Sequence, residues 1–185
     1  MILNDFSNHL RKLVNGDIEF NGRAATIGKP SEFLSKCGAD SSHDITITKK
    51  VITKAMRTET RDENGKLIGN TGHGLSFEMI VFSLQELDYP PLVFKGSSTN
   101  SLLVVTNIID QRNRNIVIAI ELNKCEGFNQ VNSIRSIYGR DHFSLFVEKN
   151  FNEGNLIGVN KKKADDLLRS IGKSYPKENT FISCD

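Results

Sequence analysis

Long apolar runs, an excess of one charge and paired cysteines are all missing from this sequence of 185 residues. The longest unbroken apolar run extends only from Ile116 to Ile120, whereas a membrane-spanning helix needs roughly 20 apolar residues. The first residues, Met1 to Phe6, lack the basic and then apolar order of a signal peptide. These absences predict a chain that acts in the cytoplasm and has no membrane partner.

Residues that hold metals and cofactors are few and scattered. The cysteines are Cys37, Cys125 and Cys184, and the histidines are His9, His43, His73 and His142. Their spacing fits neither a disulfide framework nor a metal site, and it favours a reducing compartment. The sequence also lacks a glycine-rich phosphate loop, a dinucleotide fingerprint and the nucleophile elbow of hydrolases. We therefore expect no metal and no cofactor.

The charge balance is nearly even. The chain has 24 Lys and Arg against 22 Asp and Glu, a formal net charge of +2, so the total charge alone does not indicate a nucleic-acid-binding protein. The basic residues are concentrated locally, at Lys49–Arg61, at Arg112 and Arg114, and at Lys161–Lys163. The length fits one domain with a short N-terminal extension.

The spacing of apolar residues predicts both helices and strands. Helices are expected over residues 1–15, after Pro30, over 49–56, after Ser76, over 139–150 and over 161–171. Strands are expected over 45–48, 92–94, 101–109, 115–122, 131–138 and 156–159. Ser76 and Thr48 are expected to cap helices, and residues 110–114 to form a hairpin turn. The polar stretch 58–74 is either a functional loop or a hairpin around Asn64–Gly65. The order of elements predicts an α+β fold whose antiparallel sheet is covered on one face.

Four short segments carry a resemblance. They are Thr71–Ser76, Tyr89–Lys95, Val131–Asp141 and Asn160–Ala164. In this order and spacing they resemble the MuF C-terminal domain that temperate phages and related mobile elements carry. Residues 27–38 and 45–48 also fit, so the similarity covers roughly residues 24–171. It divides the chain into an N-terminal helical extension (1–23), a MuF-C-like domain (24–172) and a tail (173–185).

The MuF C-terminal domain is similar to the barnase–EndoU–colicin–RelE-like nucleases, which are toxin domains. The resemblance implies an α+β fold in which N-terminal helices pack on an antiparallel sheet of four strands or slightly more. It also implies a metal-independent endoribonuclease, with RNA as substrate and a cognate antitoxin or immunity protein as partner. Toxins of this kind usually form the C-terminal end of a longer protein, so the chain is either an excised domain or a free-standing copy.

Metal-independent RNA cleavage requires a base, an acid and positive charge beside the phosphate, because the ribose 2′-hydroxyl attacks the adjacent phosphorus. His73 is the candidate acid or base, since glycines flank it where the polar loop meets a helix, although an ordinary loop histidine fits the same pattern. Ser136 and Tyr138 share one face of a predicted strand and complete the candidate catalytic group.

Further polar residues are candidates for substrate binding. They are Lys54, Lys95, Ser133, Arg135 and Lys161. Each also fits an ordinary solvated surface position, and the same holds for the other three histidines. Arg112 and Arg114 are expected to be turn residues that resist edge pairing.

Two other functions stay open at this point. A phage accessory or inhibitor module without catalytic activity would bind a host or phage protein through the sheet edge or the basic hairpin. A toxin with different chemistry would transfer a group onto a nucleotide or a protein.

Overall fold

The computed structural model describes residues 3–15, 24–58, 60–66, 68, 72–176 and 181–184, without the side chains of 3–7 and 13. The helices are α1 (Leu3–Asn15), α2 (Glu32–Lys36), α3 (Lys49–Met56), α4 (Phe77–Gln85), α5 (Phe143–Asn152) and α6 (Lys161–Ser170), with a 3-10 turn η1 (Glu86–Asp88). The strands are β1 (Ala24–Gly28), β2 (Ile45–Thr48), β3 (Leu92–Lys95), β4 (Ser101–Ile109), β5 (Asn115–Glu126), β6 (Asn129–Gly139), β7 (Leu156–Asn160) and β8 (Ile182–Cys184).

The strands of the described residues form one sheet of eight, in the order β1-β2-β6-β5-β4-β3-β7-β8. Neighbours from β6 to β7 pair antiparallel, as expected, but β2 pairs parallel with β6 and β8 parallel with β7. The predicted α+β class is confirmed. The expected sheet of about four antiparallel strands was too small, because β1, β2, β7 and β8 extend the central meander on both sides.

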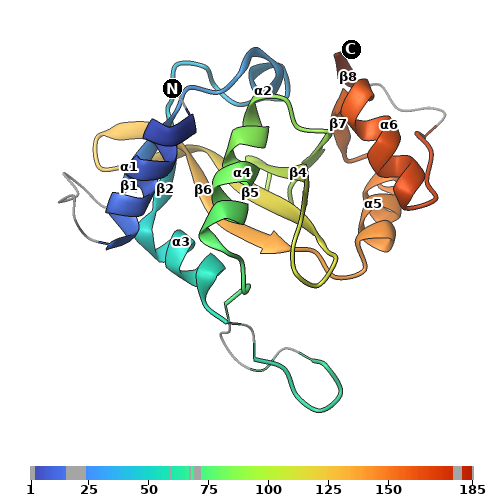
Figure 1. Ribbon diagram of the computed structural model, residues 1–185. Helices are drawn as coiled ribbons and strands as arrows, with labels where there is room; N and C mark the ends of the chain where they lie inside the picture. Colours follow the sequence, from blue (N-terminus) through green and yellow to red (C-terminus); the bar gives the residue numbers. More distant parts are fainter. Residues whose placement is uncertain are drawn as a thin grey trace.

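Helices cover both faces of the sheet, so the expectation of a sheet covered on one face was wrong, and the helices that pack on it are not only the N-terminal ones. One core contains Val93, Val104 and Ile116 of the sheet together with buried residues of α1–α4. The second contains Val105 and Val117, which point the opposite way, with buried residues of α5 and α6. Adjacent strand residues face opposite sides of a sheet, so each helix group has its own core. Figure 1 shows α1, α3 and α4 in front of the sheet and α5 and α6 beside its other end.

Local signals determine where several helices begin. The Ser76 hydroxyl accepts a hydrogen bond from the Met79 amide at 3.2 Å, and the Thr48 hydroxyl accepts one from the Val51 amide at 3.3 Å. These side chains satisfy amides that the first helical turn leaves without partners. Both predicted caps are confirmed, and the helix predicted over 49–56 has the predicted bounds.

The polar stretch after α3 projects from the body of the protein (Figure 1). Within it, the Asp62 amide donates to the Lys66 carbonyl at 2.8 Å and the Ile68 amide to the Thr60 carbonyl at 2.9 Å. Of the two alternatives for this stretch, the described residues therefore show the hairpin around Asn64–Gly65.

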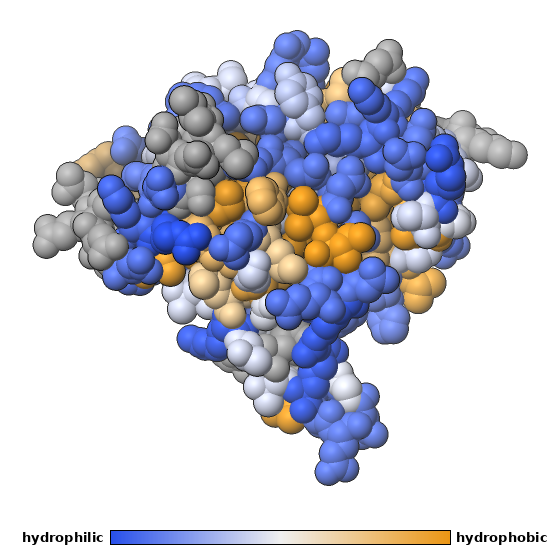
Figure 2. All heavy atoms as spheres, viewed as in Figure 1, coloured by the Kyte–Doolittle hydropathy of each residue, from blue (hydrophilic) through white to orange (hydrophobic). Residues whose placement is uncertain are grey.

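Figure 2 shows hydrophobic residues gathered over α4 and the neighbouring part of β4. Phe82 on α4 and Ile109 on β4 are about half exposed. No helix of the described residues is long and apolar enough to cross a membrane. The predicted domain boundaries stay predictions, and residues 1–2, 16–23, 177–180 and 185 of the predicted extension and tail lie outside the described residues.

Candidate functional site

The segment that carries His73 lies along the C-terminal end of α3. The His73 amide donates to the Lys54 carbonyl at 3.1 Å, and the next amide, of Gly74, donates to the Arg57 carbonyl at 2.9 Å. A Cβ atom at Gly72 would lie 1.9 Å from the Arg57 carbonyl oxygen, and Gly74 has a φ of +67°. Both positions therefore require glycine, which explains why glycines flank His73.

His73 lies against Tyr138, the penultimate residue of β6. The ring centroids are 5.7 Å apart and the ring planes are tilted by 44°. Burial raises the pKa of the half-buried Tyr138 hydroxyl, and the Arg140 guanidinium opposes this shift through its charge and a hydrogen bond. Ser136 is half-buried on the same sheet face as Tyr138, opposite Ala119 of β5. The structure therefore places His73 against Tyr138, and it places Ser136 on the same sheet face as Tyr138, two residues earlier along β6.

A hollow of about 200 Å³ lies beside the His73 ring. Its lining residues are Met56, Thr58, His73, Gly74, Asp110, Gln111, Arg112 and Arg114. We call it the basic hollow, because its lining residues include two arginines and one histidine but a single carboxylate, that of Asp110. Its walls are the end of α3, the His73 segment and the turn between β4 and β5.

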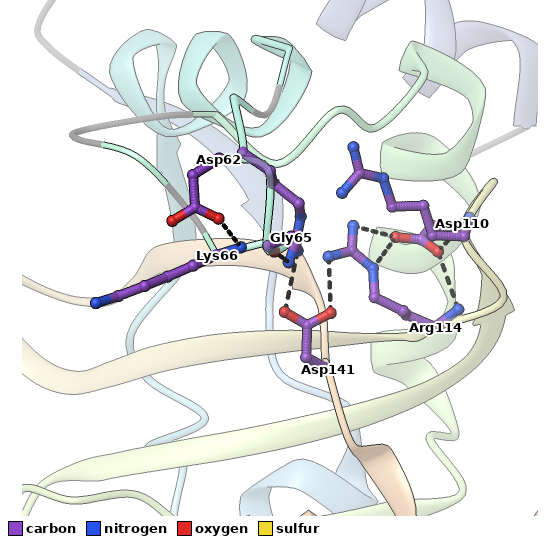
Figure 3. Close-up of polar contacts among 8 residues, drawn as sticks. Asp62, Gly65, Lys66, Asp110, Arg114 and Asp141 are labelled. Carbon is purple, nitrogen blue, oxygen red and sulfur yellow. Dashed lines mark hydrogen bonds and ion pairs between the residues drawn. The ribbon is translucent and has the colours of Figure 1, made fainter.

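Asp110 holds the β4–β5 turn in shape. Its Oδ2 accepts from Arg114 Nε at 2.7 Å and lies 2.6 Å from Nη2, while its Oδ1 accepts from the Arg112 and Arg114 amides at 2.9 Å each (Figure 3). The Asp110 and Arg114 side chains are only 3% and 8% exposed. A Cβ atom at Gly139 of β6 would lie 2.1 Å from Asp110 Oδ2, so this ion pair packs directly on the strand that carries Tyr138.

Asp141 connects the turn to the projecting hairpin. Its Oδ1 accepts from Arg114 Nη1 at 3.2 Å and its Oδ2 from Arg61 Nη2 at 3.0 Å, and Arg61 Nη1 also donates to the Gly65 carbonyl at 2.7 Å (Figure 3). Burial raises the pKa of Asp141, but the hydrogen bonds and charges of Arg61 and Arg114 outweigh it, so the net pKa lies below its ordinary value. The chain of ion pairs fixes one side of the basic hollow.

The residues predicted to bind substrate are dispersed. Lys54 is exposed on α3 beside the His73 backbone. Lys95 ends β3 and Lys161 begins α6 after β7, three and four strand spacings from β6. At about 4.8 Å per spacing, these strands lie roughly 14 and 19 Å from β6. Lys54 therefore shares the neighbourhood of His73, whereas the structure does not bring Lys95 and Lys161 to it.

Ser133 and Arg135, the two remaining candidates, have protein partners on the sheet. The Ser133 hydroxyl is buried and donates to Glu126 Oε1 at 3.1 Å. Arg135 Nη1 lies 3.3 Å from Glu121 Oε2. Both therefore lie along β6 between Tyr138 and a second hollow.

This second hollow, of about 1140 Å³, lies over β1, β2 and the far end of the β5–β6 hairpin. Its lining residues are Ala24, Thr26, Ser42, His43, Asp44, Thr46, Thr48, Lys124, Cys125, Glu126, Gly127, Phe128, Asn129, Gln130 and Val131. We call it the polar hollow, because hydroxyls, amides and a few charged groups make up most of its wall.

Sequence reasoning missed the arginines of the basic hollow. It expected Arg112 and Arg114 to be turn residues only; they do belong to the turn, and both also line the hollow. The signal that could have found them is Asp110, an acid four residues before Arg114, together with the acidic end of the segment Val131–Asp141. Among the described residues, no group of three or more His, Cys, Asp or Glu lies together as a metal site would require.

The fold and this site define a mixed α+β domain with an imidazole, a phenol and arginines at one end of a large sheet. A family model described as "Phage MuF-C-terminal domain" matches residues 66–166, more than half of the chain. The chain belongs to this phage family, and the matched segment includes His73, Arg112, Arg114 and Tyr138. No curated protein and no solved structure matches the chain.

Proposed function

We propose that this chain is a metal-independent endoribonuclease of phage origin that cleaves RNA through attack of the ribose 2′-hydroxyl on the adjacent phosphorus. The observation that carries the proposal is the contact between the His73 and Tyr138 rings, 5.7 Å apart, beside a hollow with two arginines. An imidazole titrates near neutral pH, which makes it the side chain best suited to move a proton in this reaction.

The two rings have complementary roles in the proposed reaction. His73 accepts the proton of the 2′-hydroxyl while the 2′-oxygen forms a bond to phosphorus. Tyr138 donates its proton to the 5′-oxygen as the bond from phosphorus to that oxygen breaks. The products are a 2′,3′-cyclic phosphate and a 5′-hydroxyl end. A phenol is protonated at neutral pH, as a general acid must be, and burial, which raises the pKa of Tyr138, favours the same protonated form.

The arginines compensate the charge that grows on the phosphate during attack. Arg112 is exposed at the rim of the basic hollow, and Arg114 lies deeper in its wall. Much of the Arg114 charge is balanced by Asp110 and Asp141, so Arg112, which is exposed, is the more accessible of the two guanidinium groups to a phosphate. Guanidinium groups bind phosphate oxygens through two parallel hydrogen bonds, which suits this role.

The direct test is cleavage of an RNA oligonucleotide by the purified chain in excess EDTA. We expect cleavage that leaves cyclic phosphate ends, and we expect His73→Ala to lower the rate by about 100-fold or more. Tyr138→Phe removes the acidic proton and should also lower the rate, with RNA binding unchanged. His9→Ala, on α1, is the matched control and should cleave normally.

Intact RNA after incubation with the folded wild-type chain would refute the proposal, as would normal cleavage by His73→Ala. In bacteria, the toxin role predicts that expression of the wild-type chain, but not of His73→Ala, arrests growth unless a cognate antitoxin is present. The site of action is then RNA in the bacterial cytoplasm.

A further inference from the structure

The polar hollow has a wall that the β5–β6 hairpin forms by bending. The strand register shifts between Glu121 and Lys124, and Asn123 within this bulge has a φ of +53°. Bulges of this kind bend a strand and change the direction of its end. His43 Nδ1 lies 2.9 Å from Asn123 Oδ1, which ties the bent hairpin to the loop before β2. The hollow is therefore a built feature of the fold.

One side chain on the floor of the hollow lacks a partner. Thr46 is only 6% exposed, and its Oγ1 makes no hydrogen bond to the described residues. Thr106, another buried threonine, donates to the Ile116 carbonyl at 2.9 Å. A buried hydroxyl without a partner is unfavourable, and such groups are rare in native proteins. Because Thr46 lines the hollow, a ligand there could supply the missing partner.

An aromatic ring stands at the rim of the hollow. Phe128 occupies the two-residue turn Gly127–Phe128 between β5 and β6, and its side chain is fully exposed. The next two residues, Asn129 and Gln130, are exposed as well and carry side-chain amides. A tight turn does not require phenylalanine, whereas an exposed ring is a suitable surface for stacking a flat ligand.

The charges of the polar hollow are balanced. Lys124 Nζ lies 3.0 Å from Glu126 Oε1, and Asp44 Oδ1 lies 3.0 Å from Lys29 Nζ. Lys124 is the single Lys or Arg among the described residues that line this hollow, whereas both Arg112 and Arg114 line the basic hollow. The part of a ligand that fits here is therefore flat, uncharged and rich in hydrogen-bonding groups.

We propose that the polar hollow is a nucleobase-binding subsite, in which Phe128 stacks on an unpaired base of an RNA strand. The Asn129 and Gln130 amides and the Thr46 hydroxyl provide hydrogen bonds to the base edge and the ribose. This inference rests on the proposed function in taking RNA as the ligand. From Val131 to Tyr138 the strand β6 covers roughly 23 Å, so the stacked base lies several nucleotides from the cleaved bond.

The first test measures binding without cleavage. A single-stranded 2′-O-methyl oligoribonucleotide has no free 2′-hydroxyl, so it cannot react by the proposed route. We expect Phe128→Ala to weaken its binding by about 10-fold, and Leu145→Ala, which removes an exposed side chain from α5, to have no effect. An abasic oligomer of the same length should bind wild type and Phe128→Ala equally.

A second test uses the buried hydroxyl. Thr46→Val should weaken oligonucleotide binding while leaving the midpoint of urea unfolding unchanged or higher, because it removes a polar group without a partner. The matched control Thr106→Val should lower the midpoint, since it breaks a hydrogen bond. Destabilisation by Thr46→Val with unchanged binding would show that the hydroxyl serves the fold and would contradict the subsite.

Cys125 offers a probe of occupancy, because it is exposed and lines the polar hollow. The 2′-O-methyl oligomer should slow alkylation of Cys125, read by mass spectrometry, and leave Cys184 on β8 at the far edge of the sheet unaffected. Protection of Cys125 without RNA cleavage by the wild type would retain the subsite and reject the nuclease. Cleavage without protection, and with normal binding by Phe128→Ala, would reject the subsite and retain the nuclease.

Discussion

The two hollows of this protein differ in charge and in how their residues serve the fold. In the basic hollow, Arg114 is buried, paired with Asp110 and packed on Gly139. In the polar hollow, Phe128 is fully exposed and the Thr46 hydroxyl has no partner among the described residues. The first group of side chains stabilises the structure that it belongs to, and the second does not.

This difference teaches which residues are available for ligands. Side chains that satisfy one another contribute to stability, and their replacement changes folding and function together. We expect the exposed Phe128 ring and the Thr46 hydroxyl, which has no partner among the described residues, to contribute little to stability, so their presence needs another explanation. Substitutions in the two hollows should therefore separate stability from binding.

The largest expected effect is on stability at the basic hollow. Arg114→Met leaves the Asp110 carboxylate buried without its cation, and we expect the free energy of unfolding to fall by about 3–5 kcal/mol. Urea denaturation measures it. Arg112→Met, at an exposed position of the same turn, is the control and should change stability by less than about 1 kcal/mol. Equal effects of the two substitutions would contradict the comparison.

The segment that carries His73 should be the next most sensitive. Gly72→Ala places a methyl group against the Arg57 carbonyl, so the segment must move away from α3. We expect a loss of about 1–3 kcal/mol in unfolding free energy and a lower cleavage rate at temperatures where the variant is folded. If Gly72→Ala had the same stability and cleavage rate as the wild type, the close contact between Gly72 and the Arg57 carbonyl would not be needed to position His73.

Acid should weaken the link through Asp141. The pKa of the Asp141 carboxyl is lowered in the folded protein from its ordinary value of 3.8. The ion pairs of Asp141 therefore make their full contribution to folding stability above pH 3.8, and this contribution is lost as the pH falls through the lower pKa of the folded state. We expect Asp141→Asn to have a lower melting temperature than wild type near neutral pH, with a difference that shrinks below about pH 4. Asp166→Asn, an exposed acid on α6, should show a smaller difference at neutral pH. A difference between wild type and Asp141→Asn that stays constant with pH would contradict the pairing.

The smallest effect on stability is expected at the polar hollow. Phe128→Ser removes a ring that has no buried surface, and we expect the unfolding free energy to change by no more than about 0.5 kcal/mol. The measurement is again urea denaturation, beside the binding assay. A clear loss of stability would mean that Phe128 serves the fold after all.

The local sequence pattern was sufficient to predict the helices, strands and turns, but it was not sufficient to predict how they assemble into the sheet and its two helix layers. Thr48 and the apolar spacing after it predicted α3 with the observed bounds, and residues 110–114 form the predicted turn. The parallel pairing of β2 with β6 joins Ile45 to Asn132, far along the chain, and no periodicity within either strand reports its partner. The position of α5 and α6 on the second face is likewise a property of the whole sheet.

The residues of the candidate site likewise differ in whether the sequence could predict them. His73 could be chosen from sequence because its flanking glycines are a local feature, and these glycines are explained by contacts with α3. Arg114 could not be chosen in this way, because its second carboxylate, Asp141, follows 27 residues later, after strands β5 and β6. The polar hollow was not foreseen either, since it requires the bulge at Asn123 to bend the β5–β6 hairpin.

The β4–β5 turn is held in one shape by the protein itself, because Asp110 fixes both the guanidinium of Arg114 and the amides of the turn. Under the proposed function, a phosphate at the basic hollow would meet a turn that is already in place, so little conformational entropy would be lost on association. The same rigidity would limit which phosphate geometries fit, and the RNA strand would have to adapt its own backbone to the protein.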